Sequence, residues 1–408
     1  MAKRLIAFLI FFPAFFFISS PVFAAIPDKF VVIVNPVREK ILWRNRESVE
    51  RQIKIMEENN VPSTWLLQYS VVKDRQTVEL FDNLNSSYEI GVLLEVNEEL
   101  ANESFVPYLY GRGDWARADK VLLSGYKPDE RKRMIDVLFE QFRLVFGRYP
   151  ESVGAWYIDT DSLNYIVNKY RIKSVMDVAD QYQTDSYGVW GQPWGTPYYP
   201  SRYNSILPAS SLEDQLDVVT IQWAVRDPVL GYGLTVYDST YSVQANDYIN
   251  HHGFDTNYFG NLVKSYLNSS SVLSQLTIGL EAGQEGAVFL DELEKQINWI
   301  KETERESTFV TMSEFASFFK ATYRDGNPAF FVTGVDPYNK NNTAYWFSSP
   351  YYRAFFFKEG SRFSLDDLRI YDGVGIFYDS IEEDEKDRLL REIPACIDSA
   401  KLKDNKLI

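Results

Sequence analysis

Cysteine and histidine are almost absent from this chain of 408 residues. The one cysteine, Cys396, excludes an internal disulfide, so we expect it to be a small buried apolar residue in a fold that depends on its core. The two histidines, His251 and His252, are adjacent, and adjacent side chains rarely point at one metal ion. We therefore expect a solvent-facing histidine pair, no bound metal and no cofactor.

Phosphate-binding loops, internal repeats and low-complexity tracts are also missing from the body of the sequence. The segment Gly111-Arg-Gly113 is too short to be a dinucleotide-binding fingerprint. Beyond the first 25 residues, no apolar run is long enough to cross a bilayer. A dinucleotide-binding domain and a further membrane span are thus not expected.

The first 25 residues have the three parts of a secretory signal. Lys3 and Arg4 precede an apolar core at 5–18, and small residues lead to a cleavage position after Ala24 or Ala25. We expect the signal to be removed and the protein to be secreted or extracytoplasmic, in the periplasm or at the cell surface. An uncleaved N-terminal anchor is the alternative.

The chain is strongly acidic. Its formal net charge is −15, and loss of Lys3 and Arg4 with the signal makes it −17. A body with this charge repels nucleic acid and anionic membrane surfaces, so neither is expected as a partner. A neutral or cationic partner fits better.

Strands alternate with helices from residue 26 to residue 324. A helix is predicted over 128–146, where Pro128 stands in the first turn and Ile135, Leu138 and Phe142 share one stripe. Seven or eight strand-then-helix units predict an α/β fold, a (β/α)7-8 barrel in a regular or distorted form. The expected strands are residues 30–34, 64–68, 88–96, 153–158, 174–178, 218–225, 276–280 and 308–311.

The character of the sequence changes at Asp325. Proline-containing turns separate short aromatic strands, such as 329–333 and 351–358, and a charged helix starts near Ile381. We therefore expect three parts. These are a signal peptide at 1–25, the barrel at 26–324, and a small accessory β-rich region at 325–408 that ends in a helix.

The stretch from Asp180 to Asn204 is rich in aromatic rings, proline and glycine, and it follows neither a helical nor an alternating period. We expect a long ordered loop. Aromatic rings beside acids suit a sugar site, because rings stack on sugar faces while carboxylates bind hydroxyls, so Trp190, Trp194 and Tyr198 are predicted to stack a sugar. The alternative is that these rings pack on a neighbouring domain.

Acids follow several of the predicted strands, at the end of a parallel barrel where active sites are built. A glycosidase needs two carboxylates, one as proton donor and one as nucleophile or base. The predicted catalytic set is Asp159, Glu281, Asp180 and Asp185. The predicted substrate-binding set is Arg38, Glu95, Trp190, Trp194, Tyr198, Arg226 and Asp227.

Structural roles compete with these assignments. Asp161 is as well explained as a helix N-cap, and Asp185 as a residue that fixes a turn. Arg38 and Arg226 either orient the acids or form ordinary structural ion pairs.

Residues 30–323 resemble the glycoside hydrolase and polysaccharide deacetylase barrel superfamily. The resemblance is carried by Asn35-Pro36-Val37-Arg38, Pro62-Ser-Thr-Trp-Leu-Leu67, Tyr88-Glu-Ile-Gly-Val-Leu-Leu-Glu95 and Thr311-Met-Ser-Glu-Phe315. In the deacetylases, an aspartate and two histidines of these segments hold a metal. On this resemblance Asn35 stands at the aspartate position and Tyr88 and Leu93 stand at the histidine positions, so the metal triad is absent.

The resemblance and the strand-end acids together predict an exported carbohydrate-active protein, a glycoside hydrolase that acts without a metal through two carboxylates. A catalytically inactive barrel that binds a glycan or a cell surface is the alternative, and a polysaccharide deacetylase is the third. Acids tied up in arginine pairs without an open cleft would favour the inactive binder.

Overall fold

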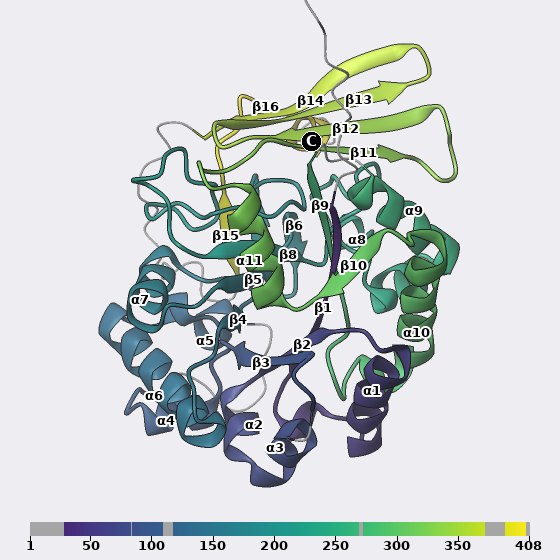
Figure 1. Ribbon diagram of the computed structural model, residues 1–408. Helices are drawn as coiled ribbons and strands as arrows, with labels where there is room; N and C mark the ends of the chain where they lie inside the picture. Colours follow the sequence, from purple (N-terminus) through teal and green to yellow (C-terminus); the bar gives the residue numbers. More distant parts are fainter. Residues whose placement is uncertain (1–27, 83, 109–116, 269–271, 372–387, 405–408) are drawn as a thin grey trace, which may run out of the picture.

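The structure, a computed structural model, describes residues 28–82, 84–108, 117–268, 272–371 and 388–404 (Figure 1). The predicted signal peptide at 1–25, the segment Gly111-Arg-Gly113 and the predicted helix start near Ile381 lie outside the described residues. In the described part of the chain, no helix combines the length and the apolarity needed to cross a bilayer.

Eight parallel strands form the main sheet, and most of their residues are apolar and buried on both faces, as in other parallel sheets. One edge of β1 pairs with β9, while its other edge pairs first with β10 and then with β2. The remaining strands continue from β2 through β3, β4 and β5 to β8, which lies against β9. The strands are β1 (Asp28–Val37), β2 (Ser63–Leu67), β3 (Tyr88–Leu93), β4 (Ser152–Gly154), β5 (Ser174–Val178), β8 (Val219–Trp223), β9 (Leu273–Ile278) and β10 (Ser307–Val310).

Helices surround this sheet, which is nearly closed (Figure 1). The predicted (β/α) barrel is therefore confirmed. The longer helices are α1 (Arg46–Asn59), α3 (Arg75–Asp82), α6 (Pro128–Phe146), α7 (Thr160–Tyr170), α9 (Thr256–Leu267), α10 (Gly286–Thr303) and α11 (Met312–Thr322). Shorter ones are α2 (Tyr69–Lys73), α4 (Glu98–Glu103), α5 (Ala118–Val121), α8 (Val236–Ser239) and α12 (Ser399–Asp404).

Helix α6 illustrates how the local sequence sets an element. It begins at Pro128 and ends before Gly147, whose φ of 71° is the left-handed conformation that terminates helices. Between them Ile135, Leu138 and Phe142 are completely buried, as the helical stripe predicted. This helix therefore covers the barrel with the face expected from the sequence.

The aromatic stretch after β5 is not a loop throughout. It opens with a hairpin of β6 (Gln181–Thr184) and β7 (Tyr187–Trp190), and β7 also pairs in parallel with β15 (Leu389–Glu392). The prediction of a continuous loop is therefore wrong for 181–190. The partner strand is distant in sequence, so no local period could reveal this pairing.

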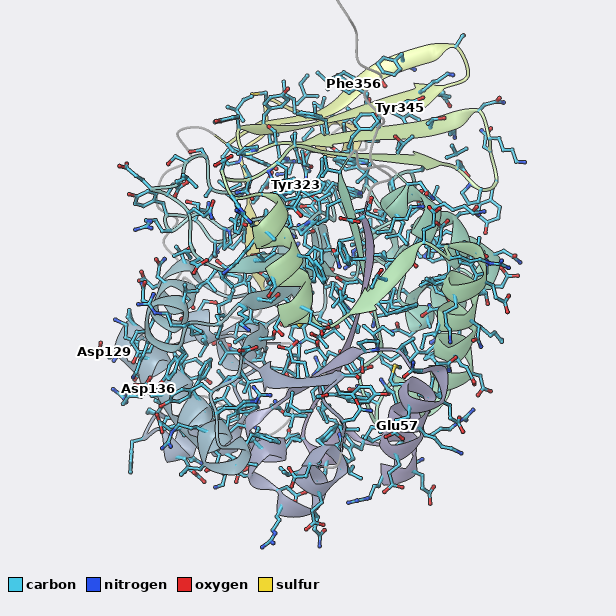
Figure 2. The ribbon with its side chains drawn as sticks, viewed as in Figure 1. Glu57, Asp129, Asp136, Tyr323, Tyr345 and Phe356 are labelled. Carbon is cyan, nitrogen blue, oxygen red and sulfur yellow. The ribbon has the colours of Figure 1, made fainter. Side chains whose placement is uncertain are left out.

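A five-stranded antiparallel sheet lies over one part of the barrel, at the top of Figure 1. Its inner face carries Trp346, whose ring stacks on Trp194 of the aromatic stretch at 3.8 Å. On the other face Phe331 is 42 % exposed, and Tyr345 and Phe356 pair across β12 and β13 (Figure 2). The strands are β11 (Phe330–Val335), β12 (Asn342–Ser348), β13 (Tyr352–Glu359), β14 (Arg362–Ile370) and β16 (Ile397–Asp398).

Buried ion pairs join this sheet to the barrel. Arg353 on β13 contacts Asp180 at 2.8 Å and Asp367 at 2.8 Å, and all three side chains are buried. Arg369 contacts the same Asp367 at 2.9 Å and also pairs with Asp398. Since each guanidinium is shared between carboxylates, the charges are compensated away from water.

Cys396 is a free, exposed cysteine. The prediction that it is buried is wrong, because it lies just before the short edge strand β16, where its amide bonds to the carbonyl of Leu368 while its side chain stays at the surface.

Candidate functional site

A cavity of about 480 Å³ lies at the carboxyl ends of the barrel strands. We call it the mouth cavity. Its ionisable lining residues include Arg38, Asp185, Arg226, Asp247, His251, Glu281 and Glu285. Its aromatic and amide side chains are Trp156, Tyr187, Trp223, Gln181, Gln244, Asn246 and Gln284. The combination of rings, amides and acids is that of a polar ligand site with stacking surfaces.

Arg38, directly after β1, links acids from two other strand ends. Its Nε and Nη2 atoms donate to the two oxygens of Glu95 at 3.1 Å each, and its Nη1 atom lies 2.5 Å from Oε2 of Glu281. The guanidinium also lies 5.1 Å from the ring centroid of Trp156. Arg38 thus joins the ends of β1, β3 and β9 at the floor of the mouth cavity.

Glu95 has its hydrogen-bonding capacity filled by the protein. Besides Arg38, it accepts hydrogen bonds from Trp156 Nε1 at 2.6 Å and from Gln68 Nε2 at 3.2 Å. It is 1 % exposed, and burial raises the pKa of its carboxyl despite the arginine. Its position is that of a residue which fixes Arg38 rather than one which meets a ligand.

Glu281 lines the mouth cavity itself. Burial is the largest influence on its carboxyl and raises the pKa from 4.5 to about 7, although Arg38 acts in the opposite direction. The negative charges of Glu95, Asp185 and Asp247 raise the pKa further. At neutral pH this carboxyl can therefore hold a proton and release it, which is the property of a general acid.

Two further acids stand beside Glu281. Glu285 accepts hydrogen bonds from Gln244 Nε2 at 2.7 Å and Asn246 Nδ2 at 2.6 Å, and burial followed by repulsion from Glu281 raises the pKa of Glu285 well above its usual value. Burial also raises the pKa of Asp247 to about 6. Neither acid was predicted, because Asp247 begins a short π-helix far beyond the end of β8 and Glu285 is the N-cap of α10 rather than a strand-end residue.

Asp185 occupies the turn between β6 and β7, with a φ of 35° and an exposed side chain. The turn role that competed with a functional one is thus present, since aspartate tolerates the left-handed conformation. Asp185 nevertheless lines the mouth cavity and acts electrostatically on Glu281. Of the four predicted catalytic acids, the structure brings Glu281 and Asp185 together at the mouth.

The other two predicted catalytic acids have structural partners and do not line the mouth cavity. Asp159 is the N-cap of α7, where it accepts from the Ser162 amide at 2.9 Å and pairs with Arg131 at 3.0 Å. The predicted cap, Asp161, instead lies in the first turn of α7. Asp180 accepts from the Gly191 amide at 2.7 Å and pairs with Arg353.

Among the predicted substrate-binding residues, Arg38 and Arg226 line the mouth cavity. Arg226 donates to Gln181 Oε1 and lies 3.6 Å from Asp247. Asp227 points elsewhere, because its Oδ1 accepts from the amides of Val229 at 2.8 Å and Leu230 at 3.0 Å. Burial raises the pKa of Asp227 to about 6.

The three rings expected to stack a sugar are buried in the interior. Trp194 packs on Trp346, and Trp190 stacks on Tyr232 at 5.2 Å while its Nε1 donates to Asp398 at 2.9 Å. Tyr198 is buried as well and donates to the Ser205 carbonyl at 3.2 Å. Trp190 and Trp194 therefore pack against the C-terminal sheet rather than face a ligand, whereas the Tyr198 hydroxyl bonds within its own segment.

Other rings line the mouth cavity in their place. Trp156 follows β4, Trp223 is the last residue of β8, and Tyr187 begins β7. Sequence reasoning missed the first two, because the predicted strands 153–158 and 218–225 place Trp156 and Trp223 inside a strand rather than at its end. Trp223 is held by a hydrogen bond from its Nε1 to Gln244 at 3.0 Å.

The residues at the deacetylase metal positions do not form a metal site. Asn35 is buried and accepts from Gln52 Nε2 at 2.8 Å, and Leu93 is a buried apolar residue. Tyr88 is the first residue of β3 and so lies at the opposite end of that strand from the mouth. Within the described ranges, no group of three histidine, cysteine, aspartate or glutamate side chains could hold a metal ion. The donor set does not fit the metal of the deacetylases.

The two histidines point in different directions. His251 lines the mouth cavity, whereas the ring of His252 stacks on Tyr241 at 3.7 Å and its Nε2 lies 2.9 Å from Thr240 Oγ1. The expectation of a solvent-facing pair holds for the exposed His251 only.

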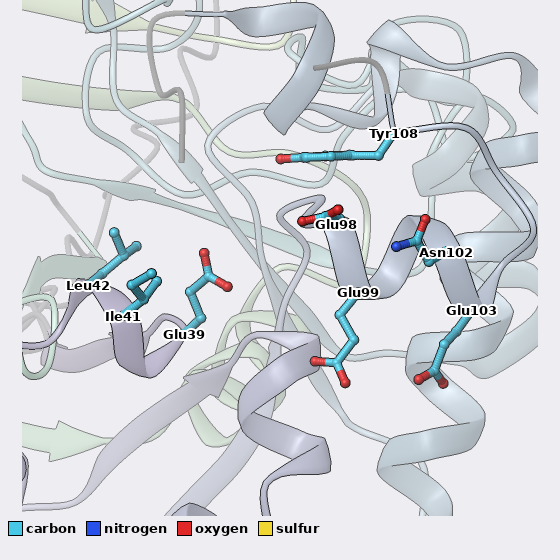
Figure 3. A pocket seen from close by; sticks show the side chains of 8 residues that line it. All are labelled: Glu39, Ile41, Leu42, Glu98, Glu99, Asn102, Glu103 and Tyr108. Carbon is cyan, nitrogen blue, oxygen red and sulfur yellow. The ribbon is translucent and has the colours of Figure 1, made fainter. Parts of the chain in front are cut away.

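A second, larger cavity of about 740 Å³ lies beyond Arg38 along the chain (Figure 3). We call it the side cavity. It is lined by Glu39, Ile41, Leu42, Glu98, Glu99, Asn102, Glu103 and Tyr108. Lys73 pairs with Glu99 at 3.2 Å and with Glu103. Four glutamates thus surround a cavity that adjoins the segment carrying Arg38.

Comparison with known proteins gives a family and a fold. Residues 125–347 match the model of a family described as "Domain of Unknown Function with solved-structure structure (DUF3863)". No curated protein matches the sequence.

Solved structures match over most of the chain. A "putative glycoside hydrolase/deacetylase" from Parabacteroides distasonis is 16 % identical, with a TM-score of 0.70 and 93 % of both chains covered. A "putative polysaccharide deacetylase" from Mycobacterium smegmatis is 12 % identical, with a TM-score of 0.43, covering 74 % of this chain and 93 % of that one. The first of these structures, with its TM-score of 0.70, confirms the resemblance to the glycoside hydrolase/deacetylase barrels as a likeness of fold.

Proposed function

Because the chain belongs to the DUF3863 family, whose description states no activity, we propose a function from the chemistry of the mouth cavity. The protein is a carbohydrate-active glycoside hydrolase that needs no metal, with Glu281 as proton donor and Asp185 as the second carboxylate. One observation carries the proposal. Glu281 lines a cavity large enough for a sugar, and the pKa of its carboxyl is raised to about 7.

The two acids divide the chemistry of glycosidic cleavage. The Glu281 carboxyl gives its proton to the glycosidic oxygen as the bond from that oxygen to the anomeric carbon breaks. The Asp185 carboxylate faces the developing positive charge and either attacks the anomeric carbon or takes a proton from the attacking water. ¹H NMR of the first product anomer distinguishes these roles, since the first retains the configuration and the second inverts it.

Arg38 positions the proton donor. Its bidentate contact with the buried Glu95 fixes the guanidinium, and its Nη1 fixes one oxygen of Glu281 at 2.5 Å. The other oxygen of Glu281 is then the one available to a ligand. Trp156, Tyr187 and Trp223 supply ring surface along the same cavity.

A catalytically inactive glycan-binding barrel is the second candidate, and the Arg38 pairs favour it. Glu281 in contact with a guanidinium is stabilised as the anion, which opposes proton donation. The presence of an open cavity beside Glu281 favours the enzyme instead. The metal-dependent deacetylase receives no support from the donor set described above.

Export is also part of the proposal, and residues 1–25 support it by their signal-like pattern. Expression with the native leader, followed by N-terminal sequencing of the exported protein, should give a chain that begins at Ala25 or Ile26. A cytoplasmic protein that retains Met1 would contradict export.

The enzyme claim is tested with the purified protein on a glycan array and on reporter glycosides, together with Glu281→Gln and the control Glu213→Gln. Glu213 is an exposed acid that does not line the mouth cavity. Turnover should be lost with the first variant and kept with the second. Glycan binding without turnover, unchanged by Glu281→Gln, would establish the inactive binder. Loss of activity on chelation would contradict the metal-free mechanism.

A further inference from the structure

We propose that the phenol hydroxyl of Tyr187 is a further substrate contact in the mouth cavity, where it hydrogen-bonds a hydroxyl of the sugar unit beside Glu281 and so determines which sugars the site accepts. This inference rests on the proposed function, because it takes for granted that the ligand is a carbohydrate. It adds a requirement on the substrate, namely a free hydroxyl on that sugar unit.

The backbone of Tyr187 is fixed from two sides. Tyr187 is the first residue of β7 and lines the mouth cavity. It pairs with Thr184 of β6 and with Leu389 of β15, and the Leu389 amide donates to the carbonyl of Ser186 at 2.8 Å. The side chain is therefore positioned before a ligand arrives, which lowers the entropy cost of binding.

The hydroxyl of Tyr187 has no hydrogen-bond partner in the part of the chain that the structure describes. Only 7 % of the residue is exposed, and its ring packs in the hydrophobic core, but the hydroxyl oxygen is not fully enclosed. A buried tyrosine hydroxyl usually has a partner, because an unmade hydrogen bond away from water is costly. A ligand in the mouth cavity can supply the partner that these residues do not.

The groups around this hydroxyl place it beside both proposed catalytic acids. The Tyr187 phenol interacts electrostatically with Asp185, Arg38, Glu281 and Arg226, and all four residues line the mouth cavity. Burial, followed by the charge of Asp185, raises the pKa of the phenol well above its usual value, although the two arginines oppose this shift. The hydroxyl therefore stays protonated, so it can donate to a sugar oxygen and accept from a sugar hydroxyl.

A neutral hydroxyl suits this position better than a charged group. Arg38 contacts Glu281, and Arg226 lies 3.6 Å from Asp247, so each cation at the mouth already has an acid beside it. A sugar without the matching hydroxyl would leave the Tyr187 phenol unpaired in the complex. Sites built to hydrogen-bond a substrate hydroxyl reject analogues that lack it for this reason.

Monodeoxy sugars test the inference. A reporter glycoside that the protein cleaves is compared with analogues that each lack one hydroxyl of the sugar unit carrying the anomeric carbon, in the wild type and in Tyr187→Phe. Loss of a hydroxyl also changes the reactivity of the glycoside, but this effect is common to both proteins and cancels in the comparison. For one analogue, the fall in kcat/KM should be at least about fivefold larger in the wild type than in the variant. If glycans bind without turnover, dissociation constants replace kcat/KM.

Tyr182→Phe is the matched control, because Tyr182 lies on the neighbouring strand β6 and does not line the mouth cavity. This variant should discriminate among the analogues as the wild type does. Tyr187→Phe should keep the Tm of the wild type, since the hydroxyl that it removes bonds to no described residue.

Two results would overturn the role of Tyr187 and leave the proposed function standing. One is an equal loss in the wild type and in Tyr187→Phe for every analogue. The other is a clear fall in the Tm of Tyr187→Phe, which would show that the hydroxyl is paired within the protein. If the wild type neither binds nor cleaves any glycan, the proposed function itself fails.

Discussion

The Nη1 atom of Arg38 lies 2.5 Å from Oε2 of Glu281, while the rest of the guanidinium is held by the two oxygens of Glu95. The Arg38 guanidinium thus connects Glu95, which is enclosed in the interior, to Glu281, which lines the mouth cavity. The arrangement places two demands on Arg38, since it must stabilise a buried carboxylate and must also orient a carboxyl that can gain and lose a proton.

Replacing Arg38 with methionine should destabilise the fold. The change leaves the buried Glu95 without its cation, and breaking a buried pair from one side costs about 3–5 kcal/mol. Urea denaturation measures the loss. The exposed Arg44, which does not line the mouth cavity, serves as control, and Arg44→Met should change the free energy of unfolding by less than about 0.5 kcal/mol. Equal losses in the two variants would show that the Arg38 pairs contribute nothing.

Glu281→Gln should remove the proposed proton donor and keep the shape of the side chain. Loss of general acid catalysis lowers kcat by about 10²–10⁴-fold. The dissociation constant for a neutral glycan should stay within a few-fold, because the amide still fills the same space. A variant that loses binding and turnover together would argue that Glu281 holds the ligand rather than donates a proton.

Activity should fall as the pH rises above about 7. The Glu281 carboxyl has a pKa of about 7 in the folded protein, and the proton it must donate is gone above that pH. The descending limb of the profile of kcat against pH measures this titration. The variant Arg38→Lys alters the partner of Glu281 and should shift the midpoint of this descending limb. A midpoint that stays near pH 7 in the variant would show that another group causes the loss of activity.

The same pKa shift predicts how Glu281 affects stability. Below about pH 4.5 the carboxyl is protonated in both the folded and the unfolded chain, so its favourable contribution is fully present. Between about 4.5 and 7 the unfolded chain ionises first, and stability falls as the pH rises through this window. Thermal unfolding of wild type and Glu281→Gln should therefore diverge in this range, and parallel curves would contradict the shift.

Trp194→Ala should affect folding and leave ligand affinity unchanged. The Trp194 ring is buried against Trp346, so its removal leaves a cavity that costs about 3–5 kcal/mol. Trp223→Phe is the matched variant at the mouth cavity, and it should weaken glycan binding with a smaller effect on stability. Denaturation and titration calorimetry on both variants distinguish the two roles. Weaker glycan binding by a folded Trp194→Ala variant would show that this ring does contribute to the binding site.

Arg353→Met should loosen the C-terminal sheet. Asp180 and Asp367 would lose their shared cation in a buried position, at a cost of about 3–5 kcal/mol. The exposed Arg362, on the neighbouring strand β14, is the control, and Arg362→Met should be nearly neutral. Hydrogen exchange of β13 amides locates the effect, and unchanged protection there would contradict it.

The barrel could be predicted from the sequence alone. Its strands are continuous apolar runs and its helices carry periodic apolar stripes, and both patterns can be recognised without knowledge of a distant partner. Helix 128–146 was predicted to the residue, since Pro128 and Gly147 mark its ends. Arg38, Glu281 and Asp185 were found for a related reason, as charged residues at or after strand ends.

Long-range contacts explain what the sequence could not reveal. Asp180 and Asp159 resemble Glu281 locally, but Arg353 and Arg131 engage them from distant positions in the chain. Trp190 and Trp194 look like ligand-stacking residues until the C-terminal sheet covers them. Composition alone does not distinguish an aromatic ring that binds a ligand from one that packs against another part of the same protein.

Strand β15 has a consequence for how the protein is made. It pairs in parallel with β7, the strand that follows the turn bearing Asp185. The ribosome releases β7 long before β15, so the nascent barrel must wait for residues 389–392 before this hairpin gains its third strand. The proposed second carboxylate therefore stands on a hairpin that gains its third strand only when residues 389–392 have been made.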